Sequence, residues 1–201
     1  TAVIRPERNT TWEAGLKGQT ADRRLTANVA LFSTVVRDFQ ANVVDTGPGA
    51  LRGYLANIPR VTVKGAEVDV VVAPIDTMSV RVGVARADGK YAAYPSGPCP
   101  LELVSSGTTA CDLTGRTLTN LPKWTLTAGI DAVQPIGDGQ IILRIDSATR
   151  SSASGDGPAS AALILPGYTL INTSIAYGRG LWEIGLFARN LTSANYLQNV
   201  T

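Results

Sequence analysis

Alternation of apolar and polar residues is the pattern that most constrains how this chain folds. Between residues 123 and 133, Trp and aliphatic residues occupy every second position, and Lys, Thr, Gly and Asp stand between them. Successive side chains of a β-strand point to opposite faces, so the pattern predicts a strand with one apolar and one polar face. Amphipathic helical periodicity is nowhere convincing. The same reasoning predicts strands at 10–19, 24–44, 54–73, 78–91, 123–133, 140–149, 167–178 and 180–190, and a ninth beginning near Tyr196.

The connections between these strands alternate between short and long. The short ones contain Gly, Pro or Asp, as tight turns require, and cover 20–24, 74–77, 135–139 and 178–180. The long ones cover about 44–53, 92–122 and 150–166. Antiparallel strands in sequential order place their connections at two opposite ends. We therefore expect all short turns at one end of the sheet and all long loops at the other.

Long strands, one apolar face and short turns at a single end are together typical of an outer-membrane β-barrel. The predicted fold class is thus all-β, an antiparallel up-and-down segment of a transmembrane barrel. Aromatic residues near strand ends suit the interfacial girdles of such a barrel, namely Trp12, Trp124, Trp182, Tyr168 and Tyr177. A soluble sandwich would show the same alternation, although its strands are usually about five or six residues long. On pattern alone both architectures stay open.

Composition excludes several classes of function. The chain has 201 residues, a net charge of only +2 and no histidine. Balanced charge argues against nucleic acid as a partner. Without histidine, neither a Ser-His-Asp triad nor a zinc site of the histidine type can be built. No apolar run is long enough for a transmembrane helix, and the opening residues lack a start methionine and a signal-peptide core. The chain therefore looks like a piece of a longer protein.

The two cysteines, Cys99 and Cys111, lie in a stretch rich in Pro, Gly, Ser and Thr that reads as a loop. A close pair without the CxxC spacing predicts a disulfide that closes a short ring, which implies an oxidising compartment. Two free thiols are the alternative.

Glu67 and Asp69 raise a separate question, because they stand two residues apart in the valine-rich strand around residues 61–73 and so share a face. Two such carboxylates could form a catalytic pair, a metal site or the wet face of a sheet. Val68, Val70 and Val72 occupy the opposite face. Lys64 also falls on that apolar face, and it fits a membrane wall only if it lies above the apolar band, near the lipid headgroups.

Four sequence motifs indicate a protein family. "RPERNTTWEAGLKGQ" (5–19), "RLTANVALFSTVVRDFQ" (24–40), "NIPRVTVKGAEVDV" (57–70) and "RNLTSANY" (189–196) resemble signature segments of TonB-dependent outer-membrane receptors, in the family's order and with suitable spacings. The resemblance implies a 22-stranded barrel with a plugged lumen. Residues 1–201 would then be a C-terminal part of the barrel, about eight to nine strands, without the plug domain and the final strand.

The resemblance also implies a function and a location. Such a receptor lies in the outer membrane of a Gram-negative bacterium, in contact with lipid, and binds an extracellular small-molecule ligand. It imports a scarce bulky solute with energy from TonB, and a ferric siderophore is the leading expectation. A glycan, a vitamin or another nutrient is the alternative cargo, and a passive porin or an adhesin is the alternative class. Neither an enzymatic activity nor a cofactor is expected.

Candidate site residues follow from the predicted faces. Facing the lumen we expect Glu13, Lys17, Glu67, Asp69, Asp131, Arg144, Glu183 and Arg189, chiefly as cross-strand charge pairs that hydrate the wall. Under the barrel reading, Glu67 and Asp69 belong to this wet face. In the long loop that contains the cysteines, Tyr91, Tyr94 and Arg116 are candidate ligand contacts.

Overall fold

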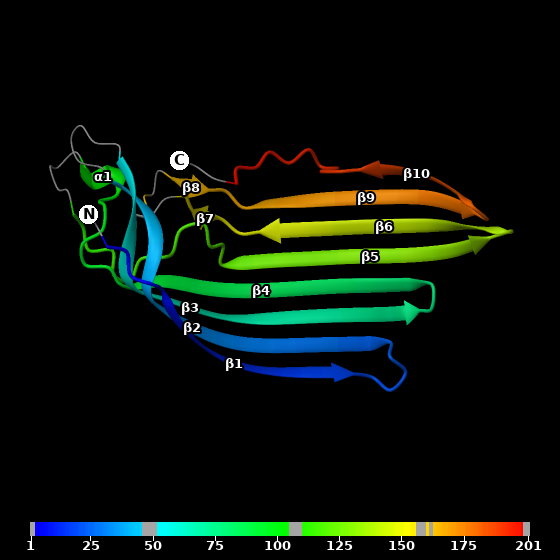
Figure 1. Ribbon diagram of the computed structural model, residues 1–201. Coiled ribbons are helices and arrows are strands. Elements are labelled where there is room, and N and C mark those ends of the chain that lie inside the picture. The colour runs from blue at the N-terminus through cyan, green and yellow to red at the C-terminus, as the bar shows by residue number, and fades with distance from the viewer. Residues whose placement is uncertain (1–2, 46–51, 105–109, 156–159, 161–162, 199–201) are drawn as a thin grey trace.

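The computed structural model describes residues 3–45, 52–104, 110–155, 160 and 163–198, and its main feature is one curved antiparallel sheet (Figure 1). The eight strands of this sheet are neighbours in the order β1-β2-β3-β4-β5-β6-β9-β10. Their bounds are β1 (Arg8–Gln19), β2 (Leu25–Asp45), β3 (Arg52–Ile75), β4 (Met78–Ala93), β5 (Trp124–Ile136), β6 (Gly139–Arg150), β9 (Tyr168–Arg179) and β10 (Trp182–Ala188). Two short strands, β7 (Ala153–Ser154) and β8 (Ile164–Leu165), pair with each other, and a short helix, α1, covers Leu101–Val104. The all-β, up-and-down prediction is confirmed, and the sheet is open.

The two ends of the sheet differ as the connection lengths predicted, with tight turns at one end and long loops at the other (Figure 1). Two of the turns contain glycines with positive φ, Gly137 at 59° and Gly180 at 57°, a backbone conformation that side chains disfavour. The turn after β1 is closed by Asp22, which accepts hydrogen bonds from the Thr20 hydroxyl and the Arg24 amide. These hydrogen bonds, that of Thr20 first, lower the pKa of the Asp22 carboxyl.

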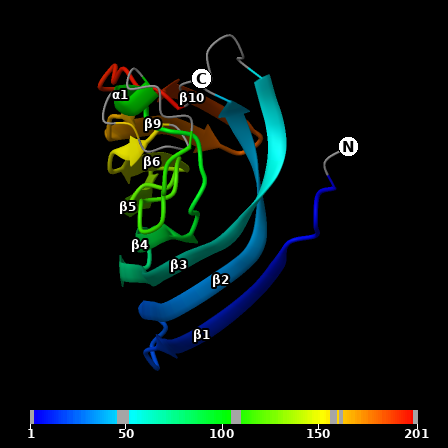
Figure 2. The ribbon, with the colours of Figure 1, turned by 90° about the vertical axis from the view of Figure 1, so that its left-hand side faces the viewer.

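The curvature of the sheet defines a concave and a convex face (Figure 2). Val61 of β3 is paired with Tyr91 of β4, and both pack against Leu113 of the loop that lies inside the curve. Val61 therefore faces the concave side. Because side chains alternate, the odd-numbered residues of β3 from Val61 to Val71 share this side, and the even-numbered ones from Thr62 to Val72 face the convex side.

The convex face is apolar over its central part. Val29, Val68, Val84 and Leu126 are direct neighbours on β2, β3, β4 and β5. Large apolar side chains on the outermost strands stand between 75% and 78% exposed, namely Trp12, Leu16, Ile184 and Leu186. An apolar surface this extensive is a liability in water and suits the lipid-facing side of a barrel.

On this face, the distance between the aromatic residues near the two ends of the strands matches the thickness of the apolar band of a membrane. Trp124 and Gln134 stand ten residues apart on β5, and Tyr177 lies in the row of Gln134, across Ile141. Ten residues of strand span about 33 Å, and a tilt of about 40° reduces this to about 25 Å, the height of the apolar band in outer-membrane barrels. Tyr168 was wrongly expected on this face. It is paired with Arg150, on the concave side, and stacks on Tyr196 at 4.6 Å between ring centroids.

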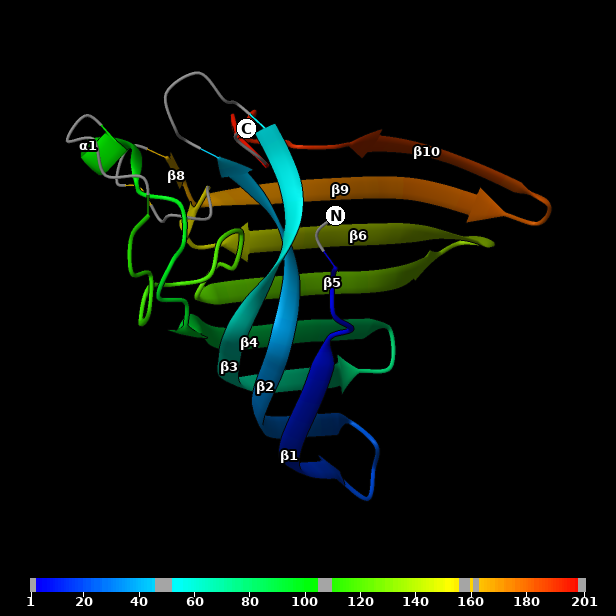
Figure 3. The same ribbon diagram turned by 60° about the vertical axis from the view of Figure 1, so that its left-hand side comes forward.

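The described residues after β10 form a turn and no ninth strand (Figure 3). Asn190 fixes this turn, since its side chain donates to the Ala194 carbonyl at 3.1 Å and accepts from the Ala194 amide at 2.9 Å. With Tyr196 stacked on Tyr168, the chain is held on the concave side rather than along the edge of β10. The strand expected to begin near Tyr196 is therefore not formed in this part of the chain.

Three of the sequence motifs meet at β2. The Arg5 side chain of the first motif donates to the Asp38 carboxylate at 2.8 Å, and its backbone amide donates to the Asn57 side chain of the third motif at 2.7 Å. Asn57 in turn donates to the carbonyls of Arg5 and Asp38. Asp38 has a positive φ of 55° and is unpaired in the ladder of β2 with β3, whose register is the same on both sides of it. The segment before β1 is thus anchored beside Asp38 of β2.

Candidate solute-facing wall on the concave face

The register places the predicted lumenal residues on the concave face. Glu13 is opposite Phe32, which is opposite Gly65, and the same alternation covers seven of them, namely Glu13, Lys17, Glu67, Asp69, Asp131, Arg144 and Glu183. Arg189 directly follows β10, with its guanidinium 5.8 Å from the ring centroid of Phe187. Phe187 is opposite Ser174, which is opposite Arg144. The concave face therefore carries a polar wall, which we call the concave wall.

Most of the expected cross-strand charge pairs do not form within the described residues. Lys17 is opposite Asn28, and Glu183 is opposite Gly178. Asp131 and Arg144 are the predicted residues that the structure brings together. They are directly opposite each other, with 3.6 Å between the Arg144 Nε atom and the Asp131 Oδ1 atom. The other predicted residues stand among small or neutral neighbours, where they hydrate the wall.

Asp131 belongs to a larger network that the sequence analysis missed. The Arg81 guanidinium of β4 bonds to the Asp131 carboxylate of β5 and reaches the Asp146 carboxylate of β6 at 3.3 Å. Arg144 completes a group of two arginines and two aspartates, which is electrically neutral. All four side chains are between 34% and 64% exposed, so solvent screens the pairs and each contributes little to stability.

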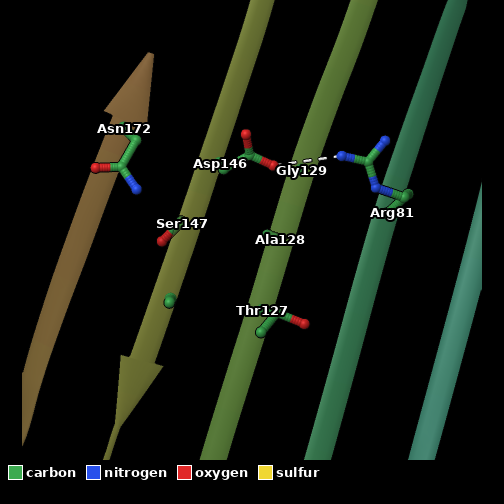
Figure 4. A pocket seen from close by; sticks show the side chains of 8 residues that line it. Arg81, Thr127, Ala128, Gly129, Asp146, Ser147 and Asn172 are labelled. Carbon is green, nitrogen blue, oxygen red and sulfur yellow. Dashed lines mark hydrogen bonds and ion pairs between the residues drawn. The ribbon is translucent and has the colours of Figure 1, made fainter. Parts of the chain in front are cut away.

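A glycine makes the longest of these contacts geometrically feasible. Figure 4 shows Arg81 and Asp146 facing each other across Gly129 of β5, the strand between them. A Cβ atom on Gly129 would lie 2.7 Å from the Arg81 Nη2 atom and 3.1 Å from the Asp146 Oδ1 atom. Arg81, Gly129 and Asp146 line a depression of about 250 Å³, to which Thr127 and Asn172 also contribute. This surface offers hydrogen-bond donors and acceptors to a polar solute.

Replacing Gly129 by alanine is expected to separate Arg81 from Asp146. A double-mutant cycle with Arg81→Gln and Asp146→Asn should give a coupling of about 0.2–1 kcal/mol in the natural protein and close to zero in the Gly129→Ala background. Gly18→Ala is the matched control, because Gly18 also lies in a strand but a Cβ there would meet nothing within 4 Å. Undiminished coupling in the Gly129→Ala background would show that this glycine does not position the pair.

Glu67 and Asp69 have no further acidic neighbour in register. Glu67 stands between Ala30 and Ala85, and Asp69 stands between Asn28 and Gly83. Among the residues that the structure describes, no group of three or more His, Cys, Asp or Glu side chains is placed to hold a metal ion. These surroundings favour the wet-face interpretation of the two carboxylates.

At the loop end, a compact cap covers part of the concave face. The cap comprises described residues 94–104 and 110–123, and Figure 2 shows it inside the curve of the sheet. Its core is a hydrophobic cluster with β3 and β4, composed of Ile58, Val61, Tyr91, Tyr94, Leu113 and Leu118. Cys99 and Cys111 form a disulfide with 5.0 Å between their Cα atoms. Reciprocal backbone hydrogen bonds of 2.9 Å between Gly97 and Cys111 lie beside it.

The cap also bonds to the connection between β6 and β9. The Asn120 amide donates to the Ser154 carbonyl at 2.8 Å. The Ser160 hydroxyl, which is only 2% exposed, donates to the Glu102 carboxylate at 2.7 Å. These two hydrogen bonds thus join the two long connections at the loop end of the sheet.

The loop tyrosines contribute to packing rather than to an open binding surface. Tyr91 is 3% exposed and Tyr94 is 7% exposed, with their ring centroids 5.3 Å apart. Burial raises the pKa of Tyr94 to about 12. Both rings are packed in the hydrophobic cluster, and their part in ligand binding stays a prediction. Arg116 lies beside β4, where its carbonyl accepts from the Tyr91 amide, and its role in ligand binding stays a prediction.

Arg150 is a second residue that sequence reasoning missed. It lies on the concave face at the loop end of β6, with its guanidinium 5.3 Å from the ring centroid of Tyr168. Its Nε and Nη2 atoms are buried and have no hydrogen-bond partner within the described part of the chain. The only signal for it in the sequence is the alternation of β6, which places Arg150 on the face of Arg144 and Asp146.

Comparison with known proteins identifies the family of the chain that forms this wall. The family model for the β-barrel of TonB-dependent-receptor-like proteins matches residues 2–191. The chain belongs to the TonB-dependent receptor β-barrel family. None of the helices in the described residues is long and apolar enough to cross a membrane.

Solved structures of similar fold include several receptors. The ferric yersiniabactin uptake receptor FyuA from Yersinia pestis superposes with a TM-score of 0.73 at 16% identity, over 96% of this chain and 26% of that one. The siderophore receptor PiuA from Acinetobacter baumannii gives 0.72 at 19%, over 95% and 25%. The copper transporter OprC gives 0.66 at 18%, over 98% and 27%. The chain thus spans about a quarter of the length of these proteins.

The family assignment confirms the resemblance seen in the four motifs. Receptors with this β-barrel lie in the outer membrane of Gram-negative bacteria, and this TonB-dependent receptor segment is part of such a barrel. The polar concave wall and the apolar convex face are those expected of the lumenal and the outer side of such a barrel. Family and fold are those of transport receptors rather than of enzymes.

Proposed function

We propose that the chain forms part of the wall of a receptor that takes up a scarce, bulky solute through the outer membrane with energy from TonB. The observation that carries the proposal is the family match over residues 2–191, joined to a polar concave wall that is capped at the loop end. In this proposal the plug domain and the segment that contacts TonB lie in other parts of the full-length protein, and the concave wall faces the plug.

A ferric siderophore is the proposed solute class. Support comes from the similar structures, among which are receptors for ferric yersiniabactin, for ferric preacinetobactin and for ferripyoverdine. The lack of histidine is compatible with this cargo, because a siderophore supplies the groups that bind its iron. One of the similar structures is a copper transporter, so similarity of fold does not restrict the cargo to siderophores. A glycan or a vitamin is the alternative.

Uptake by cells tests the proposal. A strain that lacks the full-length gene should lose uptake of radiolabelled iron from one ferric siderophore of a panel, and the gene should be induced by iron starvation. A strain without TonB is the control and should lose the same uptake. Uptake that persists without TonB would indicate a passive porin. Induction by a sugar, with unchanged iron uptake in the deletion strain, would replace the siderophore with a glycan.

A further inference from the structure

The convex face changes character toward the loop end of β1 to β4. On β3 the convex positions Val72, Val70, Val68 and Ala66 are aliphatic or small, and they are followed by Lys64, Thr62 and Arg60. On β4 three valines are followed by Arg86, Asp88 and Lys90. Six exposed cations occupy this region, which we call the basic rim: Arg8, Arg37, Arg60, Lys64, Arg86 and Lys90.

The register brings cations of the basic rim side by side. Arg8 is directly opposite Arg37, and Arg37 is directly opposite Arg60, so three arginines form one row across β1, β2 and β3. Directly opposed residues have Cβ atoms about 5 Å apart, and like charges at that distance destabilise a sheet. An arrangement of this kind is tolerable where an external anion neutralises it.

Within the described residues, one carboxylate of the basic rim stands against its six cations. Asp88 is its acidic member, opposite Lys64 and 3.6 Å from Lys90. None of Arg8, Arg37, Arg60, Lys64 and Arg86 forms an ion pair in the part of the chain that the structure describes.

Several arginines elsewhere in the described part of the sheet are paired, although Arg150 of the concave face is not. At the turn end, Arg24 bonds to Asp76 at 2.8 Å and Arg179 bonds to Asp138. On the concave wall, Arg81 contacts two aspartates. Among the described residues of the convex face, the unpaired cations are therefore concentrated in the basic rim.

The basic rim lies at the depth where a membrane presents phosphates. It begins directly beyond the aliphatic band, and two tryptophans mark the same border. Trp124 is opposite Arg86, whose guanidinium lies 5.7 Å from the ring centroid of Trp124, and Trp12 is opposite Ser33 in the row of Lys64. Exposed tryptophans of this kind occupy the membrane interface, and long basic side chains extend from the apolar band to the headgroups.

In outer-membrane barrels the long loops are extracellular, so the loop end of the sheet corresponds to the outer leaflet. We propose that the basic rim binds the phosphate groups of anionic lipids in the outer leaflet of the outer membrane. The guanidinium groups present several N–H donors in a plane that matches the oxygens of a phosphate, and a row of three can contact more than one phosphate. This inference goes beyond the proposed uptake function and depends only on the membrane location. It also accounts for Lys64, the cation that the alternation places on the apolar side.

The test uses the full-length protein in neutral detergent and a fluorescent glycolipid that carries two phosphates, lipid A, with its dephosphorylated form for comparison. The natural protein should bind the phosphorylated form more tightly than the dephosphorylated one. The Arg37→Gln/Arg60→Gln variant should lose about tenfold or more of this affinity, because two charge-assisted contacts are removed. Without the lipid, its unfolding midpoint should be unchanged or higher, since a like-charge contact is relieved.

The matched control is Arg24→Gln/Arg179→Gln, which removes the same charge at the opposite end and should change affinity less than about twofold. Equal binding of both lipid forms by the natural protein, or undiminished binding by Arg37→Gln/Arg60→Gln, would overturn the proposal. Full displacement of the lipid by inorganic phosphate would indicate a site for free anions and would overturn it as well. Loss of iron uptake in the deletion strain is independent of these outcomes.

Discussion

An arginine in place of Val70 is expected to weaken insertion of the barrel wall by about 2–4 kcal/mol. Val70 lies on the convex face near the middle of the aliphatic band, with Ala27 and Val82 as its direct neighbours on β2 and β4. At that depth a guanidinium must leave water for hydrocarbon, and its side chain reaches either interface only with strain. The same substitution on the concave face faces an aqueous lumen and carries no such penalty.

Folding of the full-length protein into lipid vesicles, followed by urea titration, measures this difference. Ala85→Arg is the matched control, because Ala85 is on the concave face opposite Glu67, where the new charge gains a partner. Glu67→Leu completes the set, and it should insert as well as the natural protein. Equal tolerance of Val70→Arg and Ala85→Arg would mean that the two faces are assigned wrongly.

The strands could be predicted from the sequence because each is long and has one apolar face. In β5, every convex residue from Trp124 to Ala132 is apolar or small, and the register then follows from the short turns at its end. The pair Asp131 and Arg144 follows from alternation, which places both on the polar face, together with the register that the short turn sets.

The rest of the concave wall could not be predicted, because it depends on side chains that reach across a third strand. Arg81 contacts Asp146 because Gly129, which lies between them, has no Cβ atom in the way. Alternation predicts the face of each residue, but it does not predict contacts that pass over a glycine of the intervening strand. Arg81 also lies in a strand whose polar face is mostly small residues, so it does not stand out by composition.

The cap was beyond prediction for a different reason. Loops lack periodicity, so nothing in residues 94–122 indicates which face their apolar side chains will cover. Tyr91 and Tyr94 look like exposed loop aromatics in the sequence, yet they are buried because Leu113 and Leu118 fold back onto β3 and β4. The disulfide brings this segment together, and only the tertiary structure shows where it packs.

The Leu113→Ala variant is expected to loosen the cap by about 2–5 kcal/mol, the range for removing a buried leucine side chain. Leu113 has no exposed surface, and its neighbours include Tyr91, Tyr94 and Ile58. The strands hold the cluster from one side only, so they cannot close a cavity left by the leucine. The substitution should therefore free the cap locally, while the sheet keeps its backbone pairing.

Hydrogen exchange at single backbone amides detects this opening in the full-length protein. The Gly115 amide, which donates to the Tyr91 carbonyl at 2.7 Å, and the Leu118 amide, which donates to the Gly89 carbonyl at 3.0 Å, should exchange at least about thirtyfold faster in Leu113→Ala. Leu103→Ala is the control, since that leucine lies in the same cap but is 43% exposed and should change exchange little. Exchange that is equally slow in both variants would show that the disulfide and the backbone hydrogen bonds hold the cap without the cluster. Faster exchange confined to the cap, with unchanged amides in β5 and β6, would identify the cap as a unit that opens separately from the barrel wall.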